Sequence, residues 1–146
     1  MPKQIIADAS LCLKWFFQEE NESERALILF NDFIQKKVSI IVPTIWLYEM
    51  ANGIRSAVLR KRISKNVGAN HFQDLLKVLP DFVDFNALIE KTYNISEDFN
   101  LSIYDSSYLS LAIAKKLPFL TGDEKLYRKA AGKIKFVKPV ASYPEL

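Results

Sequence analysis

Five short apolar runs, separated from one another by segments with helical patterning, constrain the fold of this chain most. They span Gln4–Ala7, Val38–Val42, Phe82–Phe85, Pro118–Thr121 and Lys135–Val137. Strands separated by helices pair in parallel, because each crossover connection carries the chain back to the same end of the sheet. The sequence therefore predicts an α/β fold with three layers, α/β/α, in which helices cover both faces of a mostly parallel central sheet.

The segments between the runs carry the caps and the apolar periodicity of helices. Ser10 is placed to cap a helix that begins at Leu11, Asn86 to cap a later one, and Pro80 stops a helix that begins at Ser64. The predicted helices span 11–17, 21–37, 45–62, 64–79, 86–99 and 124–131, and a further helix opens at Tyr104-Asp105. No repeat, linker or composition shift interrupts the chain, so we expect one domain over residues 1–146.

Composition and cysteine usage narrow the class of protein. A chain of 146 residues with 49% hydrophobic and 25% charged residues is typical of a globular protein. No run is long enough to span a membrane, there is no secretion signal, and the single cysteine, Cys12, cannot form an internal disulfide, so we expect a cytoplasmic protein without a membrane partner. Cys12 is interpreted as a core residue and His71 as structural, which disfavours zinc sites and Ser-His or Cys-His hydrolysis.

Basic residues gather in one part of the chain. The formal net charge is only +3, but five Lys or Arg and no acid lie between Met50 and Phe72. Such a cluster permits a polyanionic partner, although it is equally typical of a solvated helix face. The candidates for contacts with a nucleic-acid backbone are Arg55, Arg60, Lys61, Arg62 and Lys125.

The helix predicted over 45–62 has two unlike faces. Helical spacing groups Leu47, Ala51, Ile54 and Val58 as the packing stripe. The other face is small and polar and is formed by Glu49, Asn52, Gly53, Ser56 and Arg60. This second face is either a path for phosphate groups that leads away from an acidic residue or an ordinary hydrated surface.

Four acidic residues are placed to meet at one edge of the predicted sheet. Asp8 and Asp123 each follow a strand, Glu49 lies just over one turn into the helix after another strand, and Asp105 lies on the inward face of its helix with Tyr108 and Leu109. Carboxylates that are close together repel one another, so such a cluster is stable mainly when divalent cations occupy it. Oxygen ligands without His or Cys suit Mg²⁺ or Mn²⁺.

Each acid also has a purely structural interpretation. Asp8, Asp105 and Asp123 are all in positions where Asp commonly caps a helix or joins its first turn. Taken singly, capping explains each of them well. Their joint arrangement favours a metal site.

Four short motifs resemble the signature regions of PIN-domain ribonucleases, and they occur in the order found in that family. They are the strand followed by Asp8-Ala-Ser, the step Glu49-Met-Ala-Asn52, the helix Tyr104-Asp105-Ser-Ser-Tyr-Leu-Ser-Leu-Ala112, and Thr121-Gly-Asp123-Glu-Lys-Leu126. The likeness extends over essentially the whole chain. In length it is most similar to the toxin of VapBC toxin-antitoxin pairs.

The resemblance implies a strand order 3-2-1-4-5 and a Mg²⁺- or Mn²⁺-dependent endoribonuclease that cleaves RNA phosphodiester bonds with metal-activated water. Asp8, Glu49, Asp105 and Asp123 would be its catalytic and metal-binding residues, supported by Thr121 and Asn52. It also implies a homodimer and an antitoxin protein that covers the acidic groove.

Three other functions stay open on the sequence. The chain fits a housekeeping PIN nuclease that processes RNA, and it fits a catalytically idle RNA-binding domain of the same fold, although the presence of all four acids argues against the latter. A phosphoacceptor signalling module fits poorly. Such a module needs adjacent acids after the first strand, whereas Asp8 stands alone there.

Overall fold

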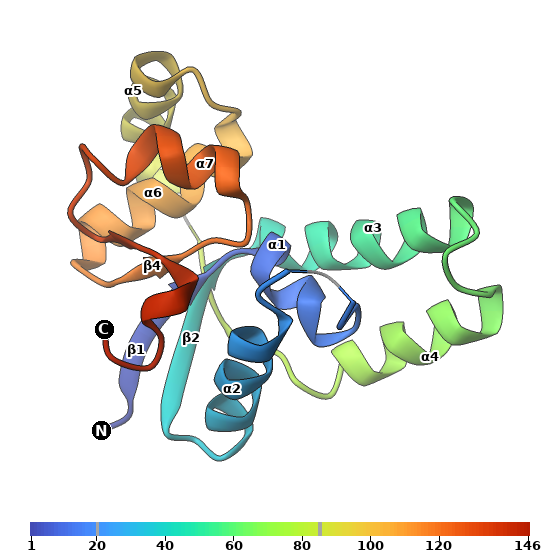
Figure 1. Cartoon of the computed structure of the whole chain (residues 1–146). Helices are drawn as coiled ribbons and strands as arrows, with labels where there is room; N and C mark the ends of the chain where they lie inside the picture. The colour runs from blue at the N-terminus through green and yellow to red at the C-terminus, as the bar shows by residue number, and fades with distance from the viewer. Residues whose placement is uncertain (20, 85) are drawn as a thin grey trace.

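Five parallel strands form one sheet at the centre of the computed structural model, which describes residues 1–19, 21–84 and 86–146 (Figure 1). The strand order is β3-β2-β1-β4-β5, as the family resemblance implies. The strands are β1 (Lys3–Ala7), β2 (Val38–Pro43), β3 (Asp81–Val83), β4 (Phe119–Leu120) and β5 (Val137–Lys138). The predicted parallel sheet is confirmed, with strand ends shifted by at most two residues; Phe85, predicted at the end of the third strand, lies outside the described residues.

Helices connect the strands as predicted. They are α1 (Ala9–Cys12), α2 (Ser23–Ile34), α3 (Ile45–Leu59), α4 (Lys65–Leu75), α5 (Ile89–Phe99), α6 (Ile103–Lys115) and α7 (Glu124–Ala130), with 3₁₀ turns η1 (Leu13–Trp15), η2 (Asn86–Leu88) and η3 (Val140–Ser142). The helix predicted over 11–17 is therefore a single α-turn followed by a 3₁₀ turn. A 3₁₀ turn is the usual tighter form of a short or ending helix.

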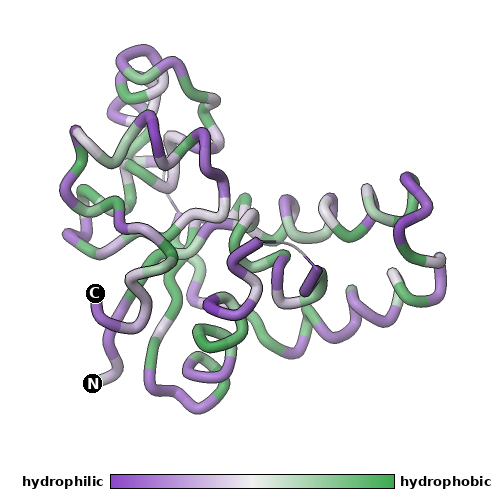
Figure 2. Tube along the Cα trace, in the orientation of Figure 1, coloured by the Kyte–Doolittle hydropathy of each residue, from purple (hydrophilic) through white to green (hydrophobic). Residues whose placement is uncertain are grey.

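Both faces of the sheet are covered, which makes the fold a three-layer α/β/α arrangement. Ile5, Ile6 and Ala7 are consecutive in β1 and all three are fully buried. Successive side chains of a strand point to opposite faces, so consecutive burial requires packing on each face. Figure 2 shows the same distribution, with apolar residues in the middle of the sheet and mixed polarity along the outer helices.

Helices α3 and α4 form an antiparallel pair that extends away from the sheet (Figure 1). The predicted packing stripe of α3 is correct only at Ile54 and is one residue too late at its other three positions. The buried residues of α3 are Trp46, Met50, Ile54 and Ala57. Ala51 and Val58 are instead partly buried and line a groove against α4. The error arose because α3 packs on two partners, the core and α4, and a single apolar stripe cannot describe both.

Several predicted helix caps are also different in the structure. Asp8, rather than Ser10, caps α1 by accepting a hydrogen bond from the Leu11 amide. Ser102 caps α6, so Asp105 lies in the first turn of that helix and is not its cap. Asn86 caps no helix, because a 3₁₀ turn precedes α5. Ser64, predicted as the first residue of its helix, caps α4 by accepting a hydrogen bond from the Val67 amide.

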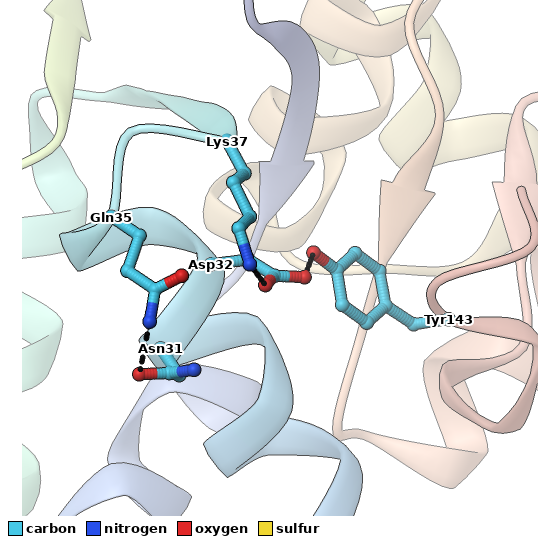
Figure 3. A network of polar contacts seen from close by, with 5 residues as sticks. All are labelled: Asn31, Asp32, Gln35, Lys37 and Tyr143. Carbon is cyan, nitrogen blue, oxygen red and sulfur yellow. Dashed lines mark hydrogen bonds and ion pairs between the residues drawn. The ribbon is translucent and has the colours of Figure 1, made fainter.

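The C-terminal tail is fastened to α2. The Tyr143 hydroxyl donates to Asp32 Oδ2 at 2.7 Å, and Lys37 Nζ lies 3.8 Å from Asp32 Oδ1 (Figure 3). Arg25 Nη1 also donates to the Tyr143 carbonyl at 2.8 Å. Tyr143 is buried, so the tail is part of the packed structure and completes the side of the molecule that carries β5.

No helix within the described residues has the length and apolarity needed to cross a membrane.

Candidate active site at the carboxyl edge of the sheet

Asp8 is the most deeply buried of the four predicted acids. It follows β1, is 4% exposed, and accepts hydrogen bonds from Ser10 Oγ (2.6 Å), from the Leu11 amide (3.0 Å) and from the Gly122 amide (3.3 Å). The Thr121 hydroxyl donates to its second oxygen, Oδ2. Burial raises the pKa of Asp8 to about 6, although these hydrogen bonds oppose the rise because they stabilise the charged form.

Glu49 lies near Asp8, on the second turn of α3, and is held by a residue from α6. The Tyr108 hydroxyl donates to Glu49 Oε1 at 2.7 Å. Burial raises the pKa of Glu49, the hydrogen bond from Tyr108 opposes the rise, and the negative charges of Asp8 and Asp105 add to it. Burial and the charge of Glu49 raise the pKa of Tyr108 far above its usual range, so Tyr108 stays protonated as the donor.

Asp105 and Asp123 complete the group. Burial raises the pKa of Asp105, and the negative charge of Asp123 adds to the rise, whereas the Ser102 hydroxyl and the positive charge of Lys129 oppose it. Asp123 caps α7 by accepting a hydrogen bond from the Leu126 amide at 3.1 Å through Oδ1. The structural interpretation is thus correct for all three residues, because Asp8 and Asp123 cap a helix and Asp105 lies in the first turn of α6.

The four acids form a chain of neighbours rather than a closed cage. The negative charges of Asp8 and Asp105 raise the pKa of Glu49, and the negative charge of Asp123 raises the pKa of Asp105. Within residues 1–19, 21–84 and 86–146, no three acidic, histidine or cysteine side chains lie close enough together to enclose a metal ion as they stand. The arrangement is a rim of mutually repelling carboxylates at the carboxyl ends of β1 and β4.

The two residues predicted to support the acids, Thr121 and Asn52, differ in their contacts with them. Thr121 contacts Asp8 directly, and its hydroxyl oxygen also accepts a hydrogen bond from the Asp123 amide at 3.0 Å, so it links two of the acids. Asn52 is exposed on α3 and makes no hydrogen bond to the four acids among the described residues. Among the described residues, Thr121 therefore contacts the acids directly, whereas Asn52 does not.

Sequence reasoning missed two contributors to this site. The sequence predicts Tyr108 on the packing face of its helix and Ser10 as a helix cap. Both are polar groups one turn or less from a predicted acid, which is the signal that was available: Tyr108 lies three residues after Asp105, and Ser10 two residues after Asp8. Their partners became visible only in the fold, since Tyr108 and Glu49 are 59 residues apart.

Comparison of the sequence with protein families decides the identity of the fold family. The family model described as "PIN domain" matches residues 5–132, which is most of the chain. The chain belongs to the PIN domain family. No match was found among curated proteins.

Three solved structures have a similar fold. PAE2754 from Pyrobaculum aerophilum superimposes with a TM-score of 0.70 at 18% identity, with 97% of this chain and 94% of that chain covered. The Mycobacterium tuberculosis toxin VapC20, described as cleaving the sarcin-ricin loop, gives 0.61 at 14% identity and covers 92% and 99%. VapBC2 from Rickettsia felis, bound to a DNA fragment from its promoter, gives 0.60 at 18% identity and covers 93% and 98%.

Proposed function

We propose that residues 1–146 act as one PIN nuclease domain, a metal-dependent endoribonuclease, with Asp8, Glu49, Asp105 and Asp123 as its catalytic and metal-binding residues. The observation that carries this proposal is the repulsion among these acids at the edge of the sheet. Burial and neighbouring negative charge raise the pKa of Glu49 and Asp105, and burial raises that of Asp8. In the part of the chain that the structure describes, none of the four carboxylates forms an ion pair with Lys or Arg, and the positive charge of Lys129 offsets only part of the rise in the pKa of Asp105.

The donor set fits a hard divalent cation. All four side chains offer carboxylate oxygens, the ligands that Mg²⁺ and Mn²⁺ prefer. The hydrogen bonds to Glu49 and Asp123 each engage one oxygen, Oε1 and Oδ1 respectively. A bound Mg²⁺ or Mn²⁺ would lower the pKa of a water molecule and offset negative charge on a phosphodiester.

The chain's own residues have distinct tasks in this account. The hydrogen bonds to Asp8 fix the direction of its carboxylate, and that of Tyr108 fixes Glu49. Asp105 and Asp123 bring negative charge from α6 and from the start of α7 to the same edge. Rigidly held groups bind and orient a substrate at a lower entropic cost than mobile ones.

We further propose that the protein is the toxin of a type II toxin-antitoxin pair, that it forms a homodimer, and that an antitoxin protein covers the acidic rim. The fold that it shares with VapC20, described as a toxin that cleaves the sarcin-ricin loop, and with VapBC2 supports this proposal. A surface of exposed apolar residues supports a protein partner. It comprises Tyr48, Ile89, Tyr93, Ile103 and Tyr104.

Incubation of the purified protein with a mixed RNA pool tests the enzymatic proposal. We expect fragments with Mg²⁺ or Mn²⁺, none with EDTA, and a loss of at least about 100-fold in rate for Asp105→Asn, which keeps the side-chain shape and removes the charge. Asp98→Asn, an acid on exposed α5 surface, is the matched control and should cleave like the wild type. Cleavage that persists in EDTA, or in Asp105→Asn at the control rate, would refute the proposal.

A further inference from the structure

The exposed apolar surface assigned above to a protein partner lies where the first turns of three helices meet. Its cavity, of about 170 Å³, is lined by residues that include Ile45 of α3, Ile89 of α5 and Ile103 of α6. In Figure 1, α3 extends to the right of the molecule and α5 lies at the top. A partner centred on the place where the three helices begin therefore meets both α3 and α5.

The exposed face of α3 beside this cavity carries a positive charge. Tyr48, Asn52, Arg55 and Leu59 are spaced by three or four residues, so they share one face of the helix, and all four are exposed. Arg55 forms no ion pair among the described residues. The segment 50–72 around it carries five Lys or Arg and no acid. α3 therefore presents an aromatic ring followed by an unpaired positive charge.

The exposed face of α5 beside the same cavity carries negative charge. Glu90 lies three residues before Tyr93 and Glu97 four residues after it, so both exposed carboxylates share the face of the Tyr93 ring. The Tyr93 hydroxyl donates to Glu97 Oε1 at 3.1 Å, and Glu90 forms no ion pair among the described residues. The segment 81–105 carries six acids and one base, Lys91. α5 therefore repeats the pattern of α3 with the opposite charge.

Two copies of the chain related by a two-fold axis can pair these helices in two ways. In like pairing, α3 faces α3 of the second copy and α5 faces α5. This arrangement brings Arg55 close to its own symmetry mate and the glutamates close to theirs, and like charges that face each other weaken an interface. In unlike pairing, α3 of each copy faces α5 of the other. Arg55 then meets Glu90 and Glu97 at two symmetric contacts.

We propose that the protein dimerises by unlike pairing, with Tyr48 of each copy packed near Tyr93 of the other and Arg55 beside Glu90 and Glu97. The inference rests on the homodimer of the proposed function and adds to it which helices pair and which charges select them. The aromatic rings contribute most of the buried area. The charges determine the orientation of the two copies more than the strength of the contact.

Charge-reversed variants test the pairing. One variant is Arg55→Glu, and the other combines Glu90→Lys with Glu97→Lys. In unlike pairing each variant alone opposes like charges at both contacts, so we expect its dimer dissociation constant to rise at least about 10-fold at low salt. An equal mixture of the two variants has opposite charges at both contacts. We expect it to form a mixed dimer with about the affinity of the wild type.

Light scattering after size-exclusion chromatography measures the mass of each sample. Native mass spectrometry separates the mixed dimer from dimers of one variant, because the two variants differ in mass. Lys91→Glu is the control for a change of charge alone. Lys91 is exposed and lies two residues before Tyr93, so it is not on the face of that ring, and the control should dimerise like the wild type.

The results separate the pairing from the rest of the proposed function. A mixed dimer formed from two monomeric variants would support unlike pairing and would show that both variants are folded. Single variants that dimerise like the wild type would indicate like pairing and overturn the proposal, as would a mixture that stays monomeric. A monomeric wild type would overturn the pairing together with the homodimer. RNA cleavage is measured in its own assay, so a failure of the nuclease proposal is seen independently of these masses.

Discussion

At the scale of single residues, Asp8 combines structural and chemical requirements that conflict. As the cap of α1 it stabilises the fold, but as a buried carboxylate it destabilises it, because burial disfavours the charge. Proteins commonly retain such unfavourable groups where activity needs them. Replacement of Asp8 by an uncharged residue should therefore raise the stability and lower the activity.

Asp8→Asn should abolish cleavage and stabilise the metal-free protein at neutral pH. The folded-state pKa of about 6 lies above the ordinary value of 3.8 for an aspartic acid side chain. The folded protein therefore binds the Asp8 proton more tightly than the unfolded chain does, and stability falls as pH rises through this window. At pH 7 the full cost, about 3 kcal/mol at 1.36 kcal/mol per pH unit, opposes folding. Asn keeps a capping side chain and has no charge to bury.

Urea unfolding of the wild type and Asp8→Asn, in EDTA at pH 7 and at pH 4.5, measures this effect. We expect the variant to be more stable by about 1–3 kcal/mol at pH 7 and by less at pH 4.5, where Asp8 is mostly protonated in the folded wild type. A stability difference that does not change between the two pH values would contradict the account of Asp8 as a buried charge.

Tyr108→Phe removes the hydroxyl that orients Glu49. We expect about 1–2 kcal/mol of lost stability, because a hydrogen bond to a charged group is lost and a half-buried carboxylate is left without it. We also expect the cleavage rate to fall by about 10-fold, as a positioning role implies. Thermal unfolding and cleavage kinetics measure the two effects, with Tyr127→Phe as control. If Tyr108→Phe lowers the stability but leaves the cleavage kinetics unchanged, the role of Tyr108 is only structural.

At the scale of elements, the turn between β4 and α7 determines the geometry of the site. A Cβ atom on Gly122 would lie 2.8 Å from the Leu11 amide nitrogen and from the Ser10 carbonyl group. Those atoms are backbone and cannot move aside without displacing α1. The glycine is therefore required by the close approach of this turn to the helix that Asp8 caps.

Gly122→Ala should accordingly damage both stability and activity. We expect a loss of about 2–3 kcal/mol in the free energy of unfolding, typical of overpacking, and a strongly reduced cleavage rate because the Gly122 amide bonds both Asp8 and Ser10. Gly132→Ala is the matched control, since a Cβ there meets no atom within 4 Å. Equal stability of the two variants, measured by urea unfolding, would show that the turn can accommodate a Cβ atom at position 122.

The order of elements was predictable from sequence, but their ends were not. Continuous apolar runs such as Val38–Val42 identify buried parallel strands because few other elements are apolar on both sides. The predicted cap was wrong at Ser10, where two polar residues, Asp8 and Ser10, compete within three positions. Which of them turns back to the helix depends on tertiary contacts, here those of Ser10 and Asp8 with Thr121.

The acids of the candidate site could be predicted from the sequence, but their long-range partners could not. Strand ends indicated Asp8 and Asp123, because parallel strands place their carboxyl ends at one edge. Tyr108 and Ser10 were not predicted as site residues, since each looks like an ordinary helix residue until α3 lies next to Tyr108 and Gly122 next to Ser10. Contacts between residues 59 or 113 positions apart have no local sequence signal.

At the scale of the whole molecule, exposed apolar residues of α3, α5 and α6 gather at one surface. Ile89, Ile103 and Tyr104 line a shallow cavity between α3, α5 and α6, and Tyr48 and Tyr93 lie one turn further along α3 and α5. Tyr93 is 56% and Tyr48 80% exposed. Aromatic side chains of this kind are enriched at protein interfaces, and the surface supports the homodimer proposed above.

Ile89→Glu should dissociate that dimer. A carboxylate at a buried apolar contact loses its hydration without gaining a partner, so we expect the variant to be monomeric at concentrations where the wild type is a dimer. Light scattering after size-exclusion chromatography measures the mass, and Leu79→Glu, an exposed apolar residue outside this surface, is the control. A wild type that is monomeric, or a variant that stays dimeric, would rule out this interface.

The most direct test of the central claim, that four repelling carboxylates form a cation site, is calorimetric titration of the metal-free protein with Mn²⁺ at pH 7. The account predicts binding to the wild type and its loss in Asp105→Asn, with Asp98→Asn binding normally. Heat of binding that is absent from the wild type, or unchanged in Asp105→Asn, would contradict it.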